Sequence, residues 1–147
     1  MPAKLTVLIP CKNERRNIRP CIESIRAIAD EIIVADSGST DGTLDIARDA
    51  FDDCRAECRI IEREYVNSAD FKNWAIPQCK HEWVLLVDAD ERIPEKLAEE
   101  IREELSAPPT NVDGYWIGRD NHYLGHRIRR CGWNTDDVIR LFRRDAS

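Results

Sequence analysis

The sequence predicts an α/β fold with a mostly parallel central sheet and helices on both faces. Short apolar runs alternate with segments of helical periodicity along the first 105 residues, a pattern typical of parallel sheets. The runs are apolar at successive positions, as expected of strands that are covered on both faces. The chain has 147 residues, the usual length of one domain, so we expect a single domain at residues 1–147.

The first part of the chain contains two predicted strand–helix pairs. Residues 4–10 form a short apolar run that is typical of a buried strand. Four isoleucines at spacings of four, three and three residues then predict a helix with one apolar stripe: Ile18, Ile22, Ile25 and Ile28. Residues 31–35 are a second buried strand. An amphipathic helix follows at residues 44–51, and Thr40 or Asp41 is placed to cap its start.

Two more strand–helix pairs follow, and then the pattern changes. Strands are predicted at residues 59–63 and 81–88, followed by helices at residues 69–80 and 93–105. Pro94 suits the start of the last helix, because proline is tolerated in the first helical turn. Beyond it the sequence predicts short, partly antiparallel strands with aromatic and Arg side chains, at residues 113–118, 122–130 and 137–144.

Charge is unevenly distributed along the chain. Residues 1–118 carry 15 basic and 24 acidic side chains, a net charge of −9, whereas residues 119–147 carry seven Arg and four Asp, a net charge of +3. An acidic body disfavours nucleic acid as a partner. The basic end suits phosphate groups of a substrate or the anionic inner membrane surface, and a solvated Arg-rich strand pair explains it equally well.

The sequence favours a cytoplasmic protein. No apolar run approaches the roughly 20 residues of a membrane span, and the apolar run near the start lacks the flanks of a signal peptide. Six cysteines at irregular spacings predict free thiols. Peripheral contact with the cytoplasmic face of the membrane, through the basic end, is compatible with this assignment.

Polar clusters follow three of the predicted strands. CKNE follows the first strand, DSGSTDGT the second and DADE the fourth. In an open parallel sheet, ligands bind in the crevice beyond the carboxyl ends of the strands. We therefore expect the three clusters to converge on one ligand site.

The DADE cluster contains Asp88, Asp90 and Glu91 within four positions. In an extended segment Asp88 and Asp90 project to one face and can bind the same ion. Carboxylates suit Mg²⁺ or Mn²⁺, which bind through one or two carboxylates plus substrate phosphates. The competing interpretation is a solvated turn, in which Asp90 and Glu91 only precede the next helix and favour its dipole.

The DSGSTDGT cluster has neither the glycine spacing of a dinucleotide fingerprint nor the lysine of a phosphate loop. Asp36, at the strand tip, is expected to be free to accept a hydrogen bond from a base or ribose. The alternative is a turn and helix cap built from Ser39, Thr40 and Asp41. The CKNE cluster is likewise explained by a helix start.

Four segments resemble glycosyltransferase family 2, the inverting nucleotide-sugar transferases of GT-A fold, in their order and spacing. They are LTVLIPCKNERRNI, EIIVADSGSTDGT, NSADFKNWAI and WVLLVDADERI. The closing stretch, RDNHYLGHRIRRCGWNTDDVIRLFRR, is similar to the branch that includes bacterial lipopolysaccharide-core β-1,4-glucosyltransferases. The resemblance covers residues 4–144 and implies a GT-A-like nucleotide-binding fold. Members of the family usually continue beyond the RLFRR stretch.

The resemblance implies a nucleotide-binding role for particular positions. Pro10 and Glu14 match the motif that shapes the nucleotide pocket, and Asp36 matches the acid that contacts the base. Lys72 and Asn73 match helix positions that flank the donor pocket. With the hydroxyl of the second cluster and the first acid of the fourth-strand cluster, the predicted nucleotide-sugar-binding set is Pro10, Glu14, Asp36, Ser39, Lys72, Asn73 and Asp88.

The resemblance also implies a metal site and a catalytic base. Asp88 and Asp90 match the acid pair whose second member binds the metal, Mg²⁺ or Mn²⁺, that bridges the donor diphosphate. Asp136 or Asp137 falls where relatives carry an acid near the acceptor, and the choice between the two stays open.

These assignments imply metal-dependent, inverting transfer of a sugar from a nucleoside-diphosphate sugar to a hydroxyl of a glycan or lipid-linked acceptor of the cell envelope. A noncatalytic nucleotide-sugar-binding module, or an inactive fragment of such an enzyme, is the alternative. A phosphatase or phosphoacceptor domain, suggested by the strand ending in Asp-x-Asp, would leave the first two polar clusters unexplained.

Overall fold

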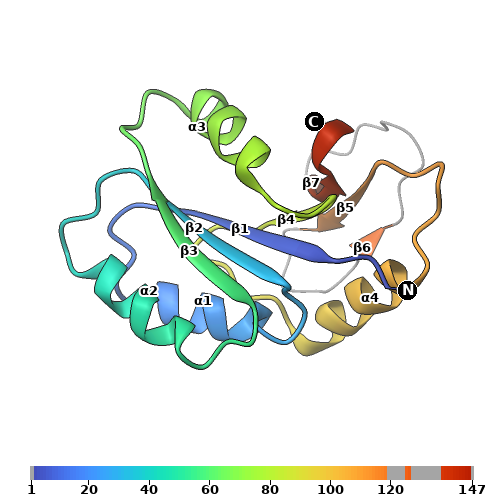
Figure 1. Cartoon of the computed structure of the whole chain (residues 1–147), viewed down its shortest axis with the longest axis horizontal. Coiled ribbons are helices and arrows are strands. Elements are labelled where there is room, and N and C mark those ends of the chain that lie inside the picture. Colours follow the sequence, from blue (N-terminus) through green and yellow to red (C-terminus); the bar gives the residue numbers. More distant parts are fainter. Residues whose placement is uncertain (1, 119–124, 127–136, 147) are drawn as a thin grey trace.

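Seven strands of the described chain form one sheet, and helices cover both of its faces (Figure 1). The computed structural model describes residues 2–118, 125–126 and 137–146. No helix in these residues is long and apolar enough to cross a bilayer. The strands are β1 (Leu5–Cys11), β2 (Glu31–Asp36), β3 (Glu57–Glu62), β4 (Trp83–Leu86), β5 (Gly114–Gly118), β6 (Gly125–His126) and β7 (Asp137–Arg143). The helices are α1 (Ile18–Ile25), α2 (Thr43–Phe51), α3 (Ser68–Ala75) and α4 (Glu95–Ser106), with 3₁₀ turns η1 (Ile76–Gln78) and η2 (Arg144–Ala146).

The strand order is β3-β2-β1-β4-β7-β5-β6. The first four strands of this order are parallel, whereas β7, β5 and β6 are joined by antiparallel pairing. The predicted parallel centre with an antiparallel C-terminal part is therefore confirmed. Cys11 of β1 pairs with Asp36 of β2, and Leu8 pairs with Leu86 of β4. The carboxyl ends of these three strands consequently lie at one edge of the sheet, the carboxyl edge.

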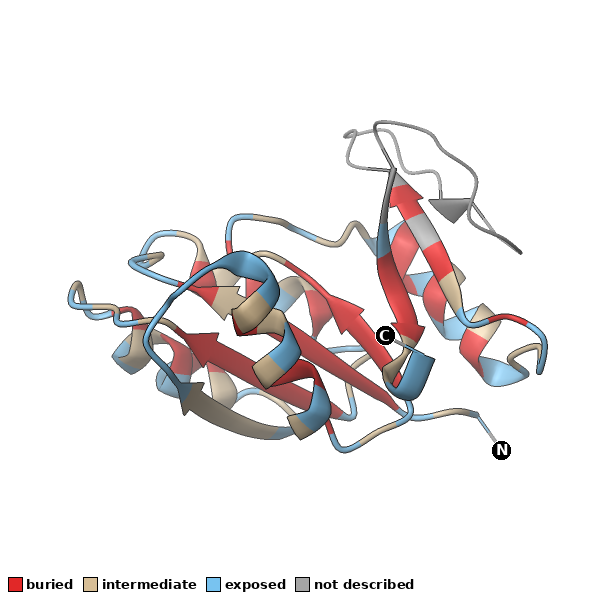
Figure 2. Ribbon diagram, turned by 90° about the horizontal axis from the view of Figure 1, so that it is seen from above, coloured by how far each residue is buried: buried red, intermediate tan, exposed pale blue. Residues whose placement is uncertain are grey.

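Successive residues of β1 pack into two different cores. Val7 and Ile9 belong to the core that includes side chains of α1, α2 and α4, and Leu8 belongs to the core that includes α3. The alternation follows from the pleat of a strand, which points neighbouring side chains to opposite faces. Figure 1 shows α1, α2 and α4 on one side of the sheet and α3 on the other. The buried central strands are red in Figure 2. Helices on both faces, as predicted, are thus confirmed.

Several elements end earlier than predicted. α1 ends at Ile25, so Ile28 lies in the turn beyond it. α3 ends at Ala75, and the predicted helix over residues 69–80 is completed by a 3₁₀ turn that contains Pro77. Proline has no N–H to continue the helical hydrogen bonds. β4 ends at Leu86, two residues before the predicted end.

Gly42, and neither Thr40 nor Asp41, is the residue at the N-terminal cap of α2, directly before Thr43. Its φ of 91° is in the left-handed region, which glycine adopts without a Cβ clash. Oδ1 of Asp41 accepts a hydrogen bond from the N–H of Thr43 at 3.1 Å. The predicted cap is therefore wrong in position, although Asp41 still supplies a hydrogen bond to the first helical residue.

A buried carboxylate closes the opposite, amino edge of the sheet. Glu31 is 1% exposed. Its Oε2 accepts hydrogen bonds from the Thr6 hydroxyl at 2.6 Å and the Lys80 N–H at 2.8 Å, and its Oε1 accepts from Arg59 Nε at 3.2 Å. A buried charge is tolerated when it is paired and hydrogen-bonded in this way. The polar groups of this edge are therefore committed to holding strands together.

Candidate active site

The loops that follow β1 and β2 are hydrogen-bonded to each other at the carboxyl edge. The Asn13 N–H donates to Ser39 Oγ at 2.8 Å, and Asn13 Oδ1 accepts from the Thr40 N–H at 2.8 Å. Asn13 has φ of 53°, a left-handed conformation that Asn tolerates better than most residues. The Arg15 N–H also donates to Asp41 Oδ2 at 3.3 Å. The first two polar clusters are thus brought together, as expected.

The loop that follows β4 joins the same edge by packing against α1. The Cys21 thiol donates to the main-chain oxygen of Asp88 at 3.7 Å, and the Ile93 N–H donates to Ser24 Oγ at 3.1 Å. Arg92 Nη2 donates to the side-chain oxygen of Asn17 at 3.1 Å. The segment after β4 therefore packs along α1, the helix that follows the first polar cluster.

Asp36 is not the free acceptor that the sequence suggests. Its side chain is 1% exposed. Oδ2 accepts hydrogen bonds from the N–H groups of Gly38 and Ser39 at 3.0 and 2.9 Å. Oδ1 accepts from the Ser39 hydroxyl, and from the Cys11 thiol at 3.4 Å. The carboxylate therefore organises the turn after β2.

Pro10 and Glu14 flank this turn. Pro10 lies beyond Leu8, the last β1 residue that pairs with β4. The missing N–H of proline therefore costs no hydrogen bond between β1 and β4. The Glu14 N–H donates to the Thr43 hydroxyl at 2.9 Å, and Glu14 Oε2 accepts from Asn17 Nδ2 at 2.8 Å. Glu14 therefore connects the start of α1 to the start of α2. This agrees in part with the alternative interpretation of the CKNE cluster, in which its residues only begin a helix.

The acidic cluster after β4 is a tight turn and not an extended segment. The Glu91 N–H donates to the Asp88 main-chain oxygen at 2.9 Å, and the Asp88 N–H donates to Glu91 Oε1 at 2.8 Å. Ala89 between them is 3% exposed, whereas Asp90 is exposed. The strand alternation invoked for Asp88 and Asp90 therefore does not apply, because β4 has already ended.

Arg140 of β7 lies against this turn. Its Nη1 is 2.8 Å from Glu91 Oε1 and its Nη2 is 3.2 Å from Glu91 Oε2, a two-pronged pairing of guanidinium and carboxylate. Nη2 is also 3.5 Å from Asp88 Oδ2. The Arg140 side chain is 7% exposed. The repulsion among the clustered acids is therefore offset inside the protein by a buried cation.

Arg143 does not belong to the site. It pairs with Trp83, the first residue of β4, and so lies toward the amino edge. Its guanidinium is 4.6 Å from the centre of the Trp83 ring, forms an ion pair with Glu82, and donates to the main-chain oxygens of Val112 and Pro109 at 3.0 Å. Its guanidinium is therefore held by contacts toward the amino edge of the sheet.

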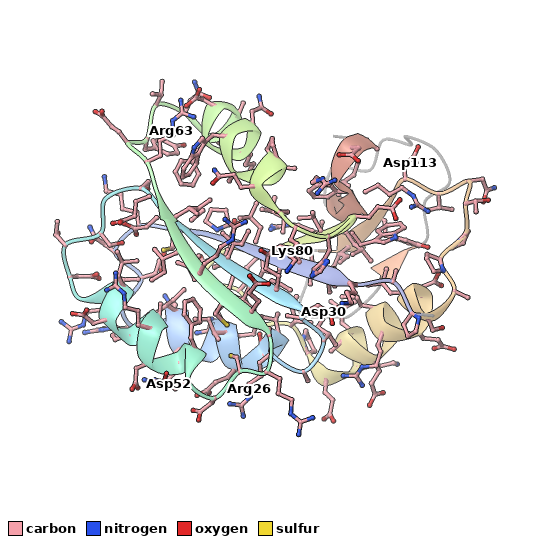
Figure 3. All side chains as sticks on the ribbon, in the orientation of Figure 1. Arg26, Asp30, Asp52, Arg63, Lys80 and Asp113 are labelled. Carbon is pink, nitrogen blue, oxygen red and sulfur yellow. The ribbon has the colours of Figure 1, made fainter. Side chains whose placement is uncertain are left out.

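Lys72 and Asn73 lie on α3, the helix over the second core. Phe71 is buried in that core, whereas Lys72 is half-buried and Asn73 is exposed. Within the described residues, neither side chain has a hydrogen bond or ion pair to the three loops. Arg63, just after β3, lies beside this helix (Figure 3), with its guanidinium 5.6 Å from the centre of the Trp74 ring.

Two buried thiols separate the acidic clusters. Cys21 is 0% exposed and Cys11 is 6% exposed. Burial raises the pKa of the Cys21 thiol to about 12, and burial followed by the nearby Asp36 raises the pKa of Cys11 still further. Both groups are therefore neutral hydrogen-bond donors in the fold and not nucleophiles.

Asp88 and Asp90 are the acids of this turn that keep carboxylate oxygens to which a divalent cation could bind. Glu91 is committed to Arg140 and to the Asp88 N–H, which leaves Asp88 Oδ1 and the Asp90 carboxylate. No group of three or more His, Cys, Asp or Glu side chains arranged around a metal exists in the part of the chain that the structure describes. Two carboxylates suit an ion such as Mg²⁺ or Mn²⁺ that completes its shell with water and phosphate oxygens.

One of the two candidates for the catalytic base, Asp137, lies in the sheet. Asp136 lies outside the described residues, as does all of the strand predicted at residues 122–130 except Gly125–His126. Asp137 is the first residue of β7, where its main chain pairs with Gly118 of β5.

Loops gathered at the carboxyl edge of a parallel sheet are the ligand-binding arrangement of open α/β proteins. Sequence comparison identifies the family within this class. The family model for glycosyl transferase family 2 matches residues 6–144. The chain therefore belongs to glycosyltransferase family 2, which confirms the resemblance found in its four motifs.

The relatives include proteins of known and unknown role. The chain is 32% identical, over 145 residues, to the lipopolysaccharide core biosynthesis glycosyltransferase LpsC of Rhizobium meliloti; the match covers 95% of this chain and 51% of LpsC. It is 36% identical, over 124 residues, to an uncharacterized glycosyltransferase of Rickettsia bellii, covering 84% of this chain and 40% of the relative. The chain thus spans about half the length of these relatives or less.

Solved structures support the fold. The mannosyltransferase PcManGT of Pyrobaculum calidifontis, in complex with GDP-Man and Mn²⁺, superposes with a TM-score of 0.64 and 26% identity, over 78% of this chain and 35% of that one. Glucosyl-3-phosphoglycerate synthase of Mycobacterium tuberculosis gives a TM-score of 0.61 at 23% identity, over 76% of this chain and 41% of that one. The GT-A-like architecture is therefore confirmed.

Proposed function

We propose that this chain is a glycosyltransferase domain that moves a sugar, in a metal-dependent and inverting reaction, from a nucleoside-diphosphate sugar to a hydroxyl of a glycan or lipid-linked acceptor. Membership of glycosyltransferase family 2 supports the reaction class. The similarity to LpsC supports an acceptor of the lipopolysaccharide or cell-envelope type. The GDP-Man and Mn²⁺ bound to PcManGT support a nucleotide-sugar donor and a divalent cation.

The observation that carries this proposal is the acidic turn at the carboxyl edge. Asp88 Oδ1 and the Asp90 carboxylate have no partner among the described residues, and the turn that carries them packs against α1, the helix that follows the loop after β1. A site with two carboxylates and no further protein ligand suits a cation that also contacts the phosphates of its substrate. Such a cation, when bound, neutralises charge that develops on the departing nucleoside diphosphate.

The protein's own residues bind and orient the two substrates. The nucleotide would lie against the turn that Asp36 and Ser39 organise, near Pro10 and Glu14, with Lys72 and Asn73 of α3 at the side of the pocket. Asp136 or Asp137 would accept the proton of the acceptor hydroxyl as that oxygen attacks the anomeric carbon and the bond to the diphosphate breaks. A single displacement of this kind inverts the configuration at that carbon.

The same proposal includes the place of action. An acceptor of lipopolysaccharide type lies at the inner membrane, so we propose cytoplasmic action with peripheral contact through the Arg-rich C-terminal stretch. Arginine suits this contact because its planar guanidinium binds phosphate groups in two-pronged fashion. Vesicle flotation with and without anionic lipid tests the contact, and equal binding to neutral and anionic vesicles would contradict it.

The metal role is tested by replacing Asp90, which has no hydrogen bond or ion pair to another described residue. Asp90→Ala is expected to abolish transfer while the melting temperature without ligand stays within about 1 °C of the parent. Asp52→Ala, an exposed acid on the α2–β3 turn, is the matched control and should transfer normally. Unchanged turnover in Asp90→Ala would refute the proposed role of this residue.

The donor is identified by thermal stabilisation. A panel of nucleotide sugars, each with and without Mn²⁺, is expected to contain one that raises the melting temperature only when Mn²⁺ is present, because a ligand of the folded state stabilises that state. Stabilisation without transfer to any acceptor would instead favour a noncatalytic nucleotide-sugar-binding module. No stabilisation by any donor would contradict both.

A further inference from the structure

Arg140 supplies the charge that balances the acidic turn. It is held by three groups of the same turn and strand: both carboxylate oxygens of Glu91 at 2.8 and 3.2 Å, Asp88 Oδ2 at 3.5 Å, and the Leu86 main-chain oxygen at 3.3 Å. With 7% of its side chain exposed, its charge is weakly screened by solvent. The positive charge of Arg140 therefore interacts strongly with the carboxylates of Asp88 and Glu91.

The contacts divide the carboxylate oxygens of the turn into two sets. Both oxygens of Glu91 and one of Asp88 face the guanidinium, whereas Asp88 Oδ1 and both oxygens of Asp90 have no described partner. A cation that approaches the turn therefore meets only the second set. Arg140 occupies both carboxylate oxygens of Glu91, so this third acid is not available to bind the cation.

The charges of the turn couple the binding of the cation to the binding of the diphosphate. Asp88, Asp90 and Glu91 contribute three negative charges and Arg140 one positive charge, a sum of −2 for the described turn. One divalent cation brings this sum to zero, so it gains less attraction than it would from three uncompensated acids. A diphosphate adds negative charge and restores the attraction. Cation binding is thereby made to depend on the diphosphate.

We infer that Arg140 is a positioning residue that acts through Asp88 and Glu91 to keep divalent-cation binding weak until a nucleoside diphosphate is present. The inference rests on the proposed function of Asp88 and Asp90 as the cation site. It assigns to β7, an element outside the DADE cluster, control over the order in which cation and donor bind.

Arg140→Met tests the inference without an activity measurement. The variant leaves three uncompensated acids, so we expect it to melt at a lower temperature in the absence of metal and to bind Mn²⁺ alone on the order of tenfold more tightly than the parent. Saturating Mn²⁺ should recover at least half of the lost melting temperature. Mn²⁺ affinity is read from the electron paramagnetic resonance signal of the free ion.

Two matched variants separate this effect from a merely structural one. Arg143→Met removes a 17% exposed arginine of the same strand that pairs with Glu82 toward the other edge; it should be destabilised without any gain in Mn²⁺ affinity. The double variant R140M/E91Q returns the sum of charges to −2, and its Mn²⁺ affinity should return to that of the parent. If R140M does not fold, R140Q should, because its amide can still hydrogen-bond to Glu91; it lacks the positive charge, so its Mn²⁺ affinity should be above that of the parent.

Equal Mn²⁺ affinities in the parent, the Arg140 variants and the Arg143→Met variant would overturn the inference. Failure of the proposed function gives a different result: UDP and GDP would then bind the parent equally with and without Mn²⁺. If Mn²⁺ restores the melting temperature of the Arg140→Met variant while UDP and GDP bind the parent equally with and without Mn²⁺, Arg140 controls cation binding and only the nucleotide site is rejected.

Discussion

Replacing Asp36 by Asn should destabilise the protein even when no ligand is present. The change keeps the shape of the side chain but removes the charge that accepts from two N–H groups, a hydroxyl and a thiol. A hydrogen bond to a charged acceptor contributes about 1.5–3 kcal/mol, against about 1 kcal/mol for a neutral one. The amide can keep its oxygen toward the N–H groups of Gly38 and Ser39, so we expect a loss of about 2 kcal/mol in the free energy of unfolding.

Urea and thermal unfolding measure this loss. For a domain of this size 2 kcal/mol corresponds to about 4–8 °C in melting temperature. Asp45→Asn is the matched control: it removes the charge of an exposed acid in the first turn of α2, which forms an ion pair with Arg48. It should lower the free energy of unfolding by less than about 1 kcal/mol. An Asp36→Asn variant as stable as the parent would refute the role of Asp36 in organising the turn. Weaker nucleotide binding at unchanged stability would instead indicate direct contact with the base.

The remaining predictions concern stability. Ile25→Ala, at a fully buried position of α1, should cost about 3 kcal/mol, and Ile28→Ala, at the half-buried position beyond the helix, less than half of that in the same urea titration. Gly42→Ala should cost about 1 kcal/mol, because φ is 91° there, and a cost no larger than that of an average surface change would contradict the strain. Burial raises the pKa of Cys21 and Cys79 from 9.0 to about 12. The contribution of these two thiols to the free energy of unfolding is therefore complete below pH 9. It is lost as the pH rises toward 12, because in this range only the unfolded state releases the proton. The urea midpoint should fall as the pH rises from 9.0 to about 12, and fall less in Cys79→Ala.

The sequence predicts those features of the fold that depend on local pattern. The continuous apolar runs at β1, β2 and β4 and the isoleucine stripe of α1 all correspond to the observed elements, because burial on one or two faces leaves a direct trace in residue order. The carboxyl edge is also predictable, since a parallel sheet brings the ends of its strands together. The family motifs then mark which of the loops carry the polar groups.

What the sequence does not predict depends on groups that are distant along the chain. The partner of Glu91 is Arg140, 49 positions later, and nothing near DADE indicates it. The hydrogen bonds of Asp36 come from the local turn and from the Cys11 thiol on the neighbouring strand β1, 25 positions earlier, so a carboxylate that looks free in the sequence is already engaged. The end of β4 is set by the turn hydrogen bonds of Asp88 and Glu91, which compete with extension of an apolar strand.

The strand order has a consequence for how the protein is made. β1 is the central strand of the parallel half, but its pairing with β4 joins Leu5 to Trp83, which is synthesised much later. Until β4 arrives, β1 has an open, strongly apolar edge, and such edges invite pairing with other chains. Pro10 protects only the far end, where it offers no N–H. Fragments that stop before residue 83 should therefore aggregate, and expression in which the chain is completed slowly should yield more insoluble protein.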